Sequence, residues 1–174
     1  NEAAIDAARK NRKCISMKDI HDEFIRMQFG TEKRTRVIPE EEKRATAYHE
    51  AGHAILSHVL PLVPDVQIIS IVPTGDAAGY IYHAPDNQMR RDSKEYMLQK
   101  IKVSLGGRIA EEFYSGNIAA GAVSDIENAT RIARRMVTIY GMSSLLGPVS
   151  YSSEGSLFRS KGYSEATAKD IDTE

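Results

Sequence analysis

The chain has 174 residues, of which 41% are hydrophobic and 27% are charged, and these proportions are typical of a folded globular domain. Its formal net charge of −1 argues against a protein that binds nucleic acid or an anionic membrane surface. The single cysteine, Cys14, excludes an internal disulfide, and the most apolar stretch, 51–72, contains too many polar residues and prolines to span a bilayer.

The first part of the chain predicts two helices. Residues 1–12 are rich in alanine and end in basic residues, which are favourable in the last turns of a helix. Ser16 is a suitable N-cap for a second helix over 17–29, and Gly30 stands where a C-terminal glycine is common. The apolar side of this second helix is expected to contain Ile20, Phe24, Ile25 and Met27.

A polar and basic stretch separates these helices from the rest of the chain. Residues 31–36 show no apolar periodicity, and we place a linker at 31–38. Pro39 and the glutamates that follow it favour the start of a new helix, because Pro is tolerated in a first turn and acidic residues complement the helix dipole. Pro61 is expected to end that helix.

Two short segments after this helix predict a small β element. Residues 67–73 and 79–83 are rich in β-branched and aromatic residues, and turn-forming residues lie between them. We expect two paired strands, joined by residues 74–78.

A second long helix is predicted from Asp92 or Ser93, with Asp92 and Glu95 as a possible capping box. Apolar residues recur at every fourth position along it, at Met97, Ile101, Leu105, Ile109 and Phe113. The pair Gly106-Gly107 interrupts this stripe, either as a kink or as a notch for close packing.

The C-terminal part of the chain predicts two more helices. Residues 124–127 form a possible capping box for a helix that would end near Gly141. Residues 150–163 are rich in serine and glycine and predict a mobile loop, after which a last helix would start near Ser164. The predicted fold class is therefore mainly α, with a small β-ribbon or sheet.

The run His49-Glu50-Ala51-Gly52-His53 is an H-E-x-x-H pattern inside the helix that starts at Pro39. A spacing of four places both imidazoles on one helix face, about 6 Å apart along the axis, so both can bind one ion. Glu50 would lie beside that ion and act as a general base toward a metal-bound water. A chance match is disfavoured because these polar side chains would be costly to bury inside a helix without a partner.

A catalytic metal site needs a third protein ligand and one open position. The residues alone leave six candidates, namely His58, Asp76, His83, Glu111, Glu112 and Asp125. His58 lies about 140° further round the helix than His53 and does not join the same cluster easily. His83 could reach the ion from a strand end, and Asp125 would be favourable in a first helical turn whatever its role. Spacing does not choose among them.

Several runs of residues together make a specific combination that extends over nearly the whole chain. In chain order they are Asn1–Ala4 with Ala7–Arg9, Tyr48–Ala54, Leu105–Glu112, Gly121–Asp125 with Ala129-Thr130 and Ala133-Arg134, Met136-Val137, Gly141–Ser143 and Leu146–Pro148. Through these runs the chain resembles the FtsH family of membrane-anchored, ATP-dependent zinc proteases.

This resemblance implies the roles of several residues. Asp125 occupies the family's aspartate position and would be the third zinc ligand beside His49 and His53. Glu111 would lie near the metal and orient one ligand, whereas Arg108, Glu112 and the glycine pair would be structural. Ser124 departs from the family pattern, in which asparagine is expected before the aspartate.

The resemblance also implies the organisation of a longer protein. Residues 1–30 would be the end of the lid of an AAA+ ATPase domain, 31–38 the linker, and 39–174 a zinc peptidase domain truncated at its C-terminus. ATP and magnesium would bind only in the missing ATPase domain, with no ATP-binding residue in this fragment, and membrane anchoring would depend on a missing N-terminal segment. The fragment itself would be soluble.

The full-length protein would be a homohexamer whose peptidase domain faces the cytoplasm or an equivalent organelle compartment. It would degrade unfolded, unneeded or damaged membrane and soluble proteins, without binding nucleic acid. The edge of the strand at 67–72 or at 79–82 could bind an extended polypeptide. A stand-alone zincin-type metallopeptidase and a catalytically inactive assembly module are the alternatives.

Overall fold

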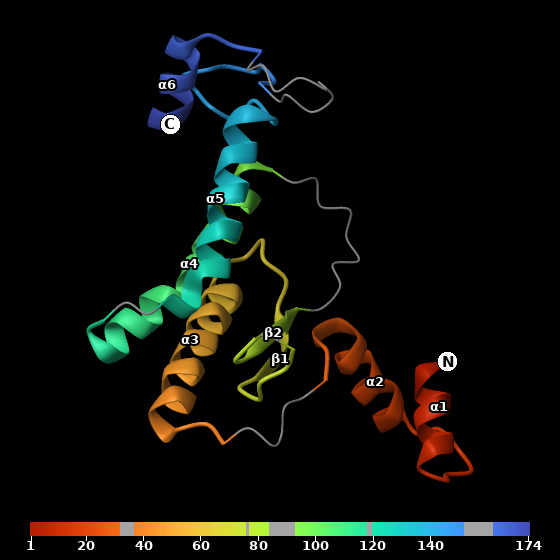
Figure 1. The fold of residues 1–174 in the computed structure, drawn as a ribbon. Coiled ribbons are helices and arrows are strands. Elements are labelled where there is room, and N and C mark those ends of the chain that lie inside the picture. The colour runs from red at the N-terminus through yellow and green to blue at the C-terminus, as the bar shows by residue number, and fades with distance from the viewer. Residues whose placement is uncertain (32–36, 76, 84–92, 118–119, 152–161) are drawn as a thin grey trace.

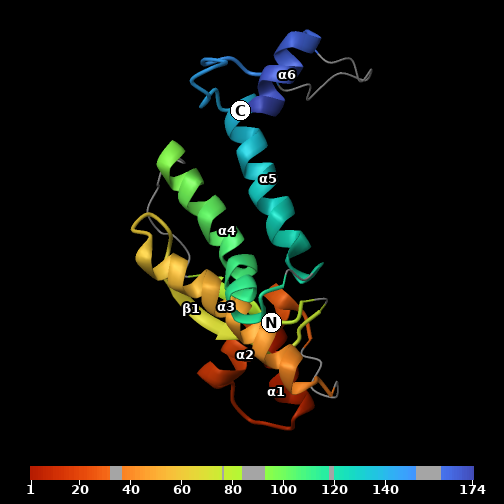
Figure 2. The ribbon, with the colours of Figure 1, turned by 90° about the vertical axis from the view of Figure 1, so that its left-hand side faces the viewer.

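The computed structural model describes residues 1–31, 37–75, 77–83, 93–117, 120–151 and 162–174. Within these ranges the chain is mainly helical and contains one two-stranded antiparallel sheet, as predicted (Figure 1). The elements are α1 (Glu2–Arg9), α2 (Met17–Phe29), α3 (Glu40–Val59), β1 (Val66–Ser70), β2 (Tyr80–His83), α4 (Lys94–Ser115), the 3₁₀ turn η1 (Ala120–Ala122), α5 (Val123–Thr138) and α6 (Glu165–Thr173). Helix α3 lies against α4, and α4 lies against α5 (Figure 2).

The start of α2 is fixed by a capping box. Ser16 is the N-cap, as predicted, and its hydroxyl accepts from the backbone N–H of Asp19, whose carboxylate accepts in return from the Ser16 backbone N–H at 2.8 Å. Asp19 is only 3% exposed and also pairs with Arg12, which ties the segment after α1 to α2.

The prediction of an apolar side on α2 is wrong for most of the residues named, because they are not buried. Ile25 is buried, but Ile20, Phe24 and Met27 are 48%, 36% and 70% exposed. The buried face of α2 instead contains Ile25 together with Asp19 and Glu23. These two acidic side chains can be buried because each is paired with an arginine.

The C-terminal end of α2 packs on the sheet through aromatic rings. Phe29 stacks on Tyr80 with ring centroids 4.0 Å apart, and Phe24 meets Tyr82 edge to face at 5.2 Å. Because side chains alternate along a strand, Ile81 and His83 extend from the opposite face of β2. The two strands were predicted from the sequence, and they pair antiparallel with Ile69 opposite Ile81.

Glycines bring α3 and α4 into backbone contact. A Cβ added at Gly52 would collide with the carbonyl oxygen of Gly106, and one added at Gly106 would lie 2.9 Å from the carbonyl oxygen of Gly52. Helix α4 continues through Gly106 and Gly107 without interruption. The glycine pair is therefore a close-packing notch, one of the two predicted possibilities, and not a kink.

The predicted apolar stripe on α4 is buried only at its start. Met97 is buried, whereas Ile109 is 46% exposed and Phe113 is 87% exposed. The face that α4 buries contains polar and small residues, because its glycines meet α3 and its Ser104 hydroxyl accepts a hydrogen bond from Asn128 of α5 at 2.8 Å.

Two predicted capping boxes need correction. Ser93 is the N-cap of α4 and accepts from the backbone N–H of Tyr96, whereas Asp92 lies outside the described residues. Helix α5 begins at Val123 with Ala122 as its N-cap and no side-chain cap, because the 3₁₀ turn leads directly into it. Ser124 is consequently already inside the first turn.

The predicted last helix is present, with Ser164 as its N-cap, whereas most of the predicted loop at 150–163 lies outside the described residues. None of the described helices is long and apolar enough to cross a membrane.

The glycine contact generates a stability prediction. Gly52→Ala should lower the free energy of unfolding by about 1–3 kcal/mol, as overpacking does, although alanine alone would favour the helix by about 1 kcal/mol. Urea denaturation followed by circular dichroism measures the change. Gly121→Ala is the matched control, because a Cβ there meets nothing within 4 Å. Equal stability of the two variants would contradict the contact.

Asp19 generates a pH prediction. Hydrogen bonds from Ser16 and the charge of Arg12 lower the pKa of Asp19 to about 2. A depressed pKa stabilises the folded chain above the unfolded pKa of about 3.9, and this stabilisation is lost as pH falls toward 2. Asp19→Asn should therefore be less stable than the parent at neutral pH, with the difference disappearing in acid. Asp22→Asn, at an exposed position of the same helix, should show no such pH-dependent difference.

Candidate metal centre

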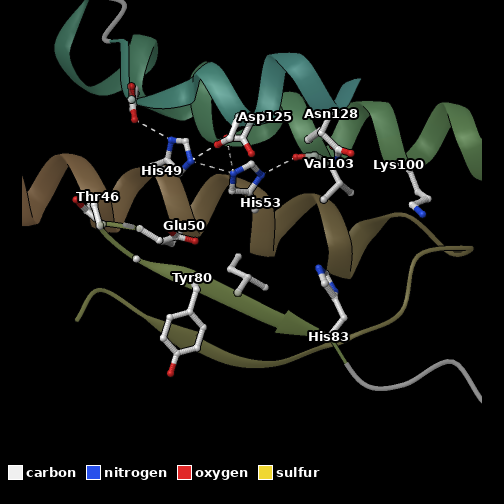
Figure 3. A pocket seen from close by; sticks show the side chains of 18 of the residues that line it. Thr46, His49, Glu50, His53, Tyr80, His83, Lys100, Val103, Asp125 and Asn128 are labelled. Atoms are coloured by element: carbon white, nitrogen blue, oxygen red, sulfur yellow. Dashed lines mark hydrogen bonds and ion pairs between the residues drawn. The ribbon is translucent and has the colours of Figure 1, made fainter. Parts of the chain in front are cut away.

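The candidate site lies in a cleft of about 820 Å³ whose lining residues come mainly from α3, α4, the start of α5 and β2, with others from the segments that follow α3 and precede β2 (Figure 3). Helix α3 contributes His49, Glu50 and His53 to this cleft, and α5 contributes Asp125. Segments that are far apart in the sequence therefore bring their polar side chains to one place.

Three possible ligand atoms converge in the cleft. Oδ2 of Asp125 lies 3.0 Å from His49 Nε2 and 3.2 Å from His53 Nε2, and the two Nε2 atoms are 3.0 Å apart. Two ligand atoms held about 2.0 Å from a tetrahedral ion are about 3.3 Å apart, so the spacing suits zinc. Among the described residues, these three side chains form the one group of His, Cys, Asp and Glu that could hold a metal ion.

Acceptors on α4 orient both imidazoles. His49 Nδ1 donates to Glu111 Oε1 at 2.7 Å, and His53 Nδ1 donates to the Val103 carbonyl oxygen at 2.6 Å. Because these partners only accept, each neutral ring carries its hydrogen on Nδ1 and its lone pair on Nε2. Two lone pairs 3.0 Å apart repel each other unless a cation lies between them, and this is the arrangement of metal-binding histidines.

Gly107 provides the space that the two rings need. A Cβ at this position would lie 2.5 Å from His49 Cε1 and 2.5 Å from His53 Nε2, closer than real Cβ contacts. A residue with a side chain would therefore displace both imidazoles.

The charges around Asp125 favour a bound cation. Burial works against its charged form, but the two imidazoles, which donate from Nε2 to its Oδ2 when they are protonated, hold the pKa of Asp125 well below its usual range. Burial also opposes protonation of His49, yet the hydrogen bond and charge of Asp125, with the charge of Glu111, raise the pKa of this imidazole. The carboxylates thus attract positive charge to the point where the ligand atoms meet.

Glu50 lies beside the three ligand atoms and not among them. It is 6% exposed, and a Cβ on Gly79, just before β2, would lie 2.7 Å from its Oε1. Burial raises the pKa of Glu50, although the charges of His49 and His53 oppose this. A buried carboxylate with a raised pKa is suited to accept a proton and to release it again.

The other predicted candidates do not join the ligand group. Glu111 lies behind His49, and Glu112 and His58 are exposed. His83 is half-buried, and its Nδ1 donates to the Pro64 carbonyl oxygen at 2.9 Å. Asp76 lies outside the described residues.

Three contributors to the site were missed by sequence reasoning. The Val103 carbonyl gives no sequence signal, because every residue type has a backbone carbonyl. Gly79 belongs to no motif that would mark it as a neighbour of Glu50. Gly107 had a signal, since a glycine pair inside a helix is unfavourable without a reason. That signal was interpreted as a kink or as a notch for close packing, and not as space for the imidazoles.

An H-E-x-x-H helix whose histidines converge with an aspartate defines a metalloprotease centre. In line with this, residues 36–174 match peptidase family M41. The whole chain is 46% identical to "ATP-dependent zinc metalloprotease FtsH 3" of Symbiobacterium thermophilum and 43% identical to "ATP-dependent zinc metalloprotease FtsH" of Thermotoga maritima. The chain belongs to peptidase family M41, and the resemblance stated from its motifs is confirmed.

The chain spans 29% and 30% of the length of these two relatives. Their names specify zinc, which agrees with the predicted cofactor. The donor set agrees as well, because two imidazoles and one carboxylate are common zinc ligands.

Glu111 generates a prediction about metal affinity. Glu111→Gln should weaken zinc binding by about 10–100-fold, because His49 loses a charged acceptor that fixes its ring. Competition with a chromogenic chelator measures the dissociation constant. Glu112→Gln changes the neighbouring, exposed carboxylate and should leave the affinity unchanged. An equal loss in both variants would contradict the orienting role.

Proposed function

We propose that this chain is the zinc-dependent endopeptidase part of a membrane-anchored, ATP-dependent protease that degrades unfolded, unneeded or damaged proteins. The observation that carries the proposal is the convergence of His49, His53 and Asp125 next to a buried glutamate in an open cleft. Residues 1–30 would be the end of the ATPase lid, 31–38 the linker and 39–174 the peptidase domain. The family match beginning at residue 36 supports this division.

His49, His53 and Asp125 would hold the zinc ion, which supplies a Lewis acid and lowers the pKa of a bound water. Glu50 would take the proton from that water at its carboxylate and return it to the leaving amine. Glu111 and the Val103 carbonyl would keep the imidazole lone pairs directed at the metal, as the hydrogen bonds on both Nδ1 atoms indicate. All these groups are present, which favours an active enzyme over an inactive assembly module.

The strand that would bind substrate is β2. Residues 77–81 and His83 line the cleft, whereas no residue of β1 does. Of the two edges considered from the sequence, the one at 79–82 is therefore favoured. An extended polypeptide added along β2 would pass the metal centre, and main-chain pairing would bind it with little sequence preference.

A hexamer is supported by the exposed apolar surface. Large hydrophobic side chains are exposed on several helices, among them Ile55 on α3, Phe113 on α4 and Val123 on α5. Exposed apolar surface of this kind is typical of sites that other subunits or further segments of the chain cover. ATP-dependence rests on the names of the relatives, and membrane anchoring rests on the family resemblance alone.

The decisive test is Glu50→Gln. The parent chain, loaded with zinc, should hydrolyse casein, and the variant should lose about 10²–10⁴-fold of that activity while it still binds zinc. Metal content is measured by atomic absorption and hydrolysis by release of labelled peptides. Glu112→Gln should retain full activity. Undiminished hydrolysis by Glu50→Gln would reject the assigned base.

A further inference from the structure

The charges in the cleft are distributed unevenly. Among its described lining residues, the carboxylates are Glu42, Glu50, Glu111 and Asp125, whereas the one lysine or arginine is Lys100. Figure 3 shows Lys100 at the end of the cleft where His83 lies, away from Glu50 and Thr46. An extended ligand in this cleft therefore meets acidic groups around the metal centre and a cation further along.

Lys100 is free to pair with a ligand. Its ammonium lies 5.2 Å from the centre of the Tyr96 ring and forms no ion pair with another described residue. Lys100 precedes Val103 by about one turn of α4, and the Val103 carbonyl accepts from His53. The positive charge thus lies on the wall of the cleft, about one helical turn along α4 from the residue that orients His53.

His83 forms the opposite wall at this end of the cleft. Its Nδ1 donates to the Pro64 carbonyl oxygen, which fixes the ring and leaves Nε2 for a ligand. Figure 3 shows the ring directed from the end of β2 into the cleft. In the neutral ring Nε2 only accepts, so Lys100 supplies the positive charge at this end of the cleft and His83 forms its wall.

We propose that Lys100, with His83 opposite, forms a subsite that selects an acidic side chain of the polypeptide substrate. The proposal rests on the peptidase function proposed above. Gly79, just before β2, lies beside Glu50, and His83 is the last residue of β2. These two residues are roughly 13 Å apart along the strand, at 3.3 Å per residue. The metal ligands lie between these ends, so the selected residue is about two to four positions from the scissile bond.

The test measures peptide binding separately from hydrolysis. Fluorescein-labelled extended peptides carry one aspartate, moved stepwise along the sequence, or asparagine at the same place. Fluorescence anisotropy with the zinc-loaded Glu50→Gln chain gives their dissociation constants. At low salt, aspartate at one or two adjacent positions should improve affinity about two- to fivefold over asparagine, as a partly exposed charge pair does. The preference should decrease as salt is added.

Two variants separate a subsite from a general effect of charge. Lys100→Gln should abolish the preference for aspartate, and Lys100→Glu should replace it with a preference for lysine at the same position. Lys102→Gln removes the same charge from an exposed position of α4 that does not line the cleft, and it should keep the preference.

The peptide-binding results can fail without any failure of the proposed peptidase function. Equal affinity for the aspartate and asparagine peptides, or loss of the preference in Lys102→Gln as well, overturns the subsite. Casein hydrolysis by the parent chain tests the peptidase function independently. Hydrolysis without any dependence on acidic residues rejects the subsite alone.

Discussion

The contact between α3 and α4 is the constraint on which the site depends. Gly52 and Gly106 allow the two backbones to touch, and Gly107, one residue further, leaves room for the imidazoles. At ordinary helix spacing, the Val103 carbonyl could not accept a hydrogen bond from His53. The close approach therefore turns two histidines on one helix into a pair with directed lone pairs.

The rest of the fold completes this pair from two sides. Helix α5 begins directly from a 3₁₀ turn, which brings Asp125 in its first turn to the two Nε2 atoms. The hydrogen bond from Asn128 to Ser104 joins α5 to α4 one turn later. On the other side, β2 borders the cleft and encloses Glu50, whose pKa is raised by burial. The ligands and the carboxylate beside them thus come from different layers of the structure.

The sequence predicted well what is encoded locally. The limits of α2, the start of α3, both strands and the N-cap Ser164 follow from caps, prolines and β-branched runs, each a property of adjacent residues. The H-E-x-x-H spacing likewise predicted two candidate ligands, because helix geometry alone places their imidazoles together. Asp125 came from the family resemblance, since spacing along the chain left six candidates open.

The failures have a common physical cause. Ile109 and Phe113 follow a helical period, yet periodicity cannot show which face of α4 meets a neighbour, and small and polar residues form that face instead. A backbone carbonyl such as that of Val103 carries no residue-specific mark. Contacts between distant segments therefore decided the parts of the site that local patterns could not predict.

The two faces of β2 have different neighbours, and this has a mechanical consequence. The rings of Tyr80 and Tyr82 pack against α2, while Ile81 and His83 extend from the other face and line the cleft, which Tyr80 also borders. A displacement of α2 cannot leave the strand in place unless the stacked rings separate. A movement of the N-terminal helices would therefore shift β2 and change the shape of the cleft, while the candidate metal ligands on α3 and α5 stay in place.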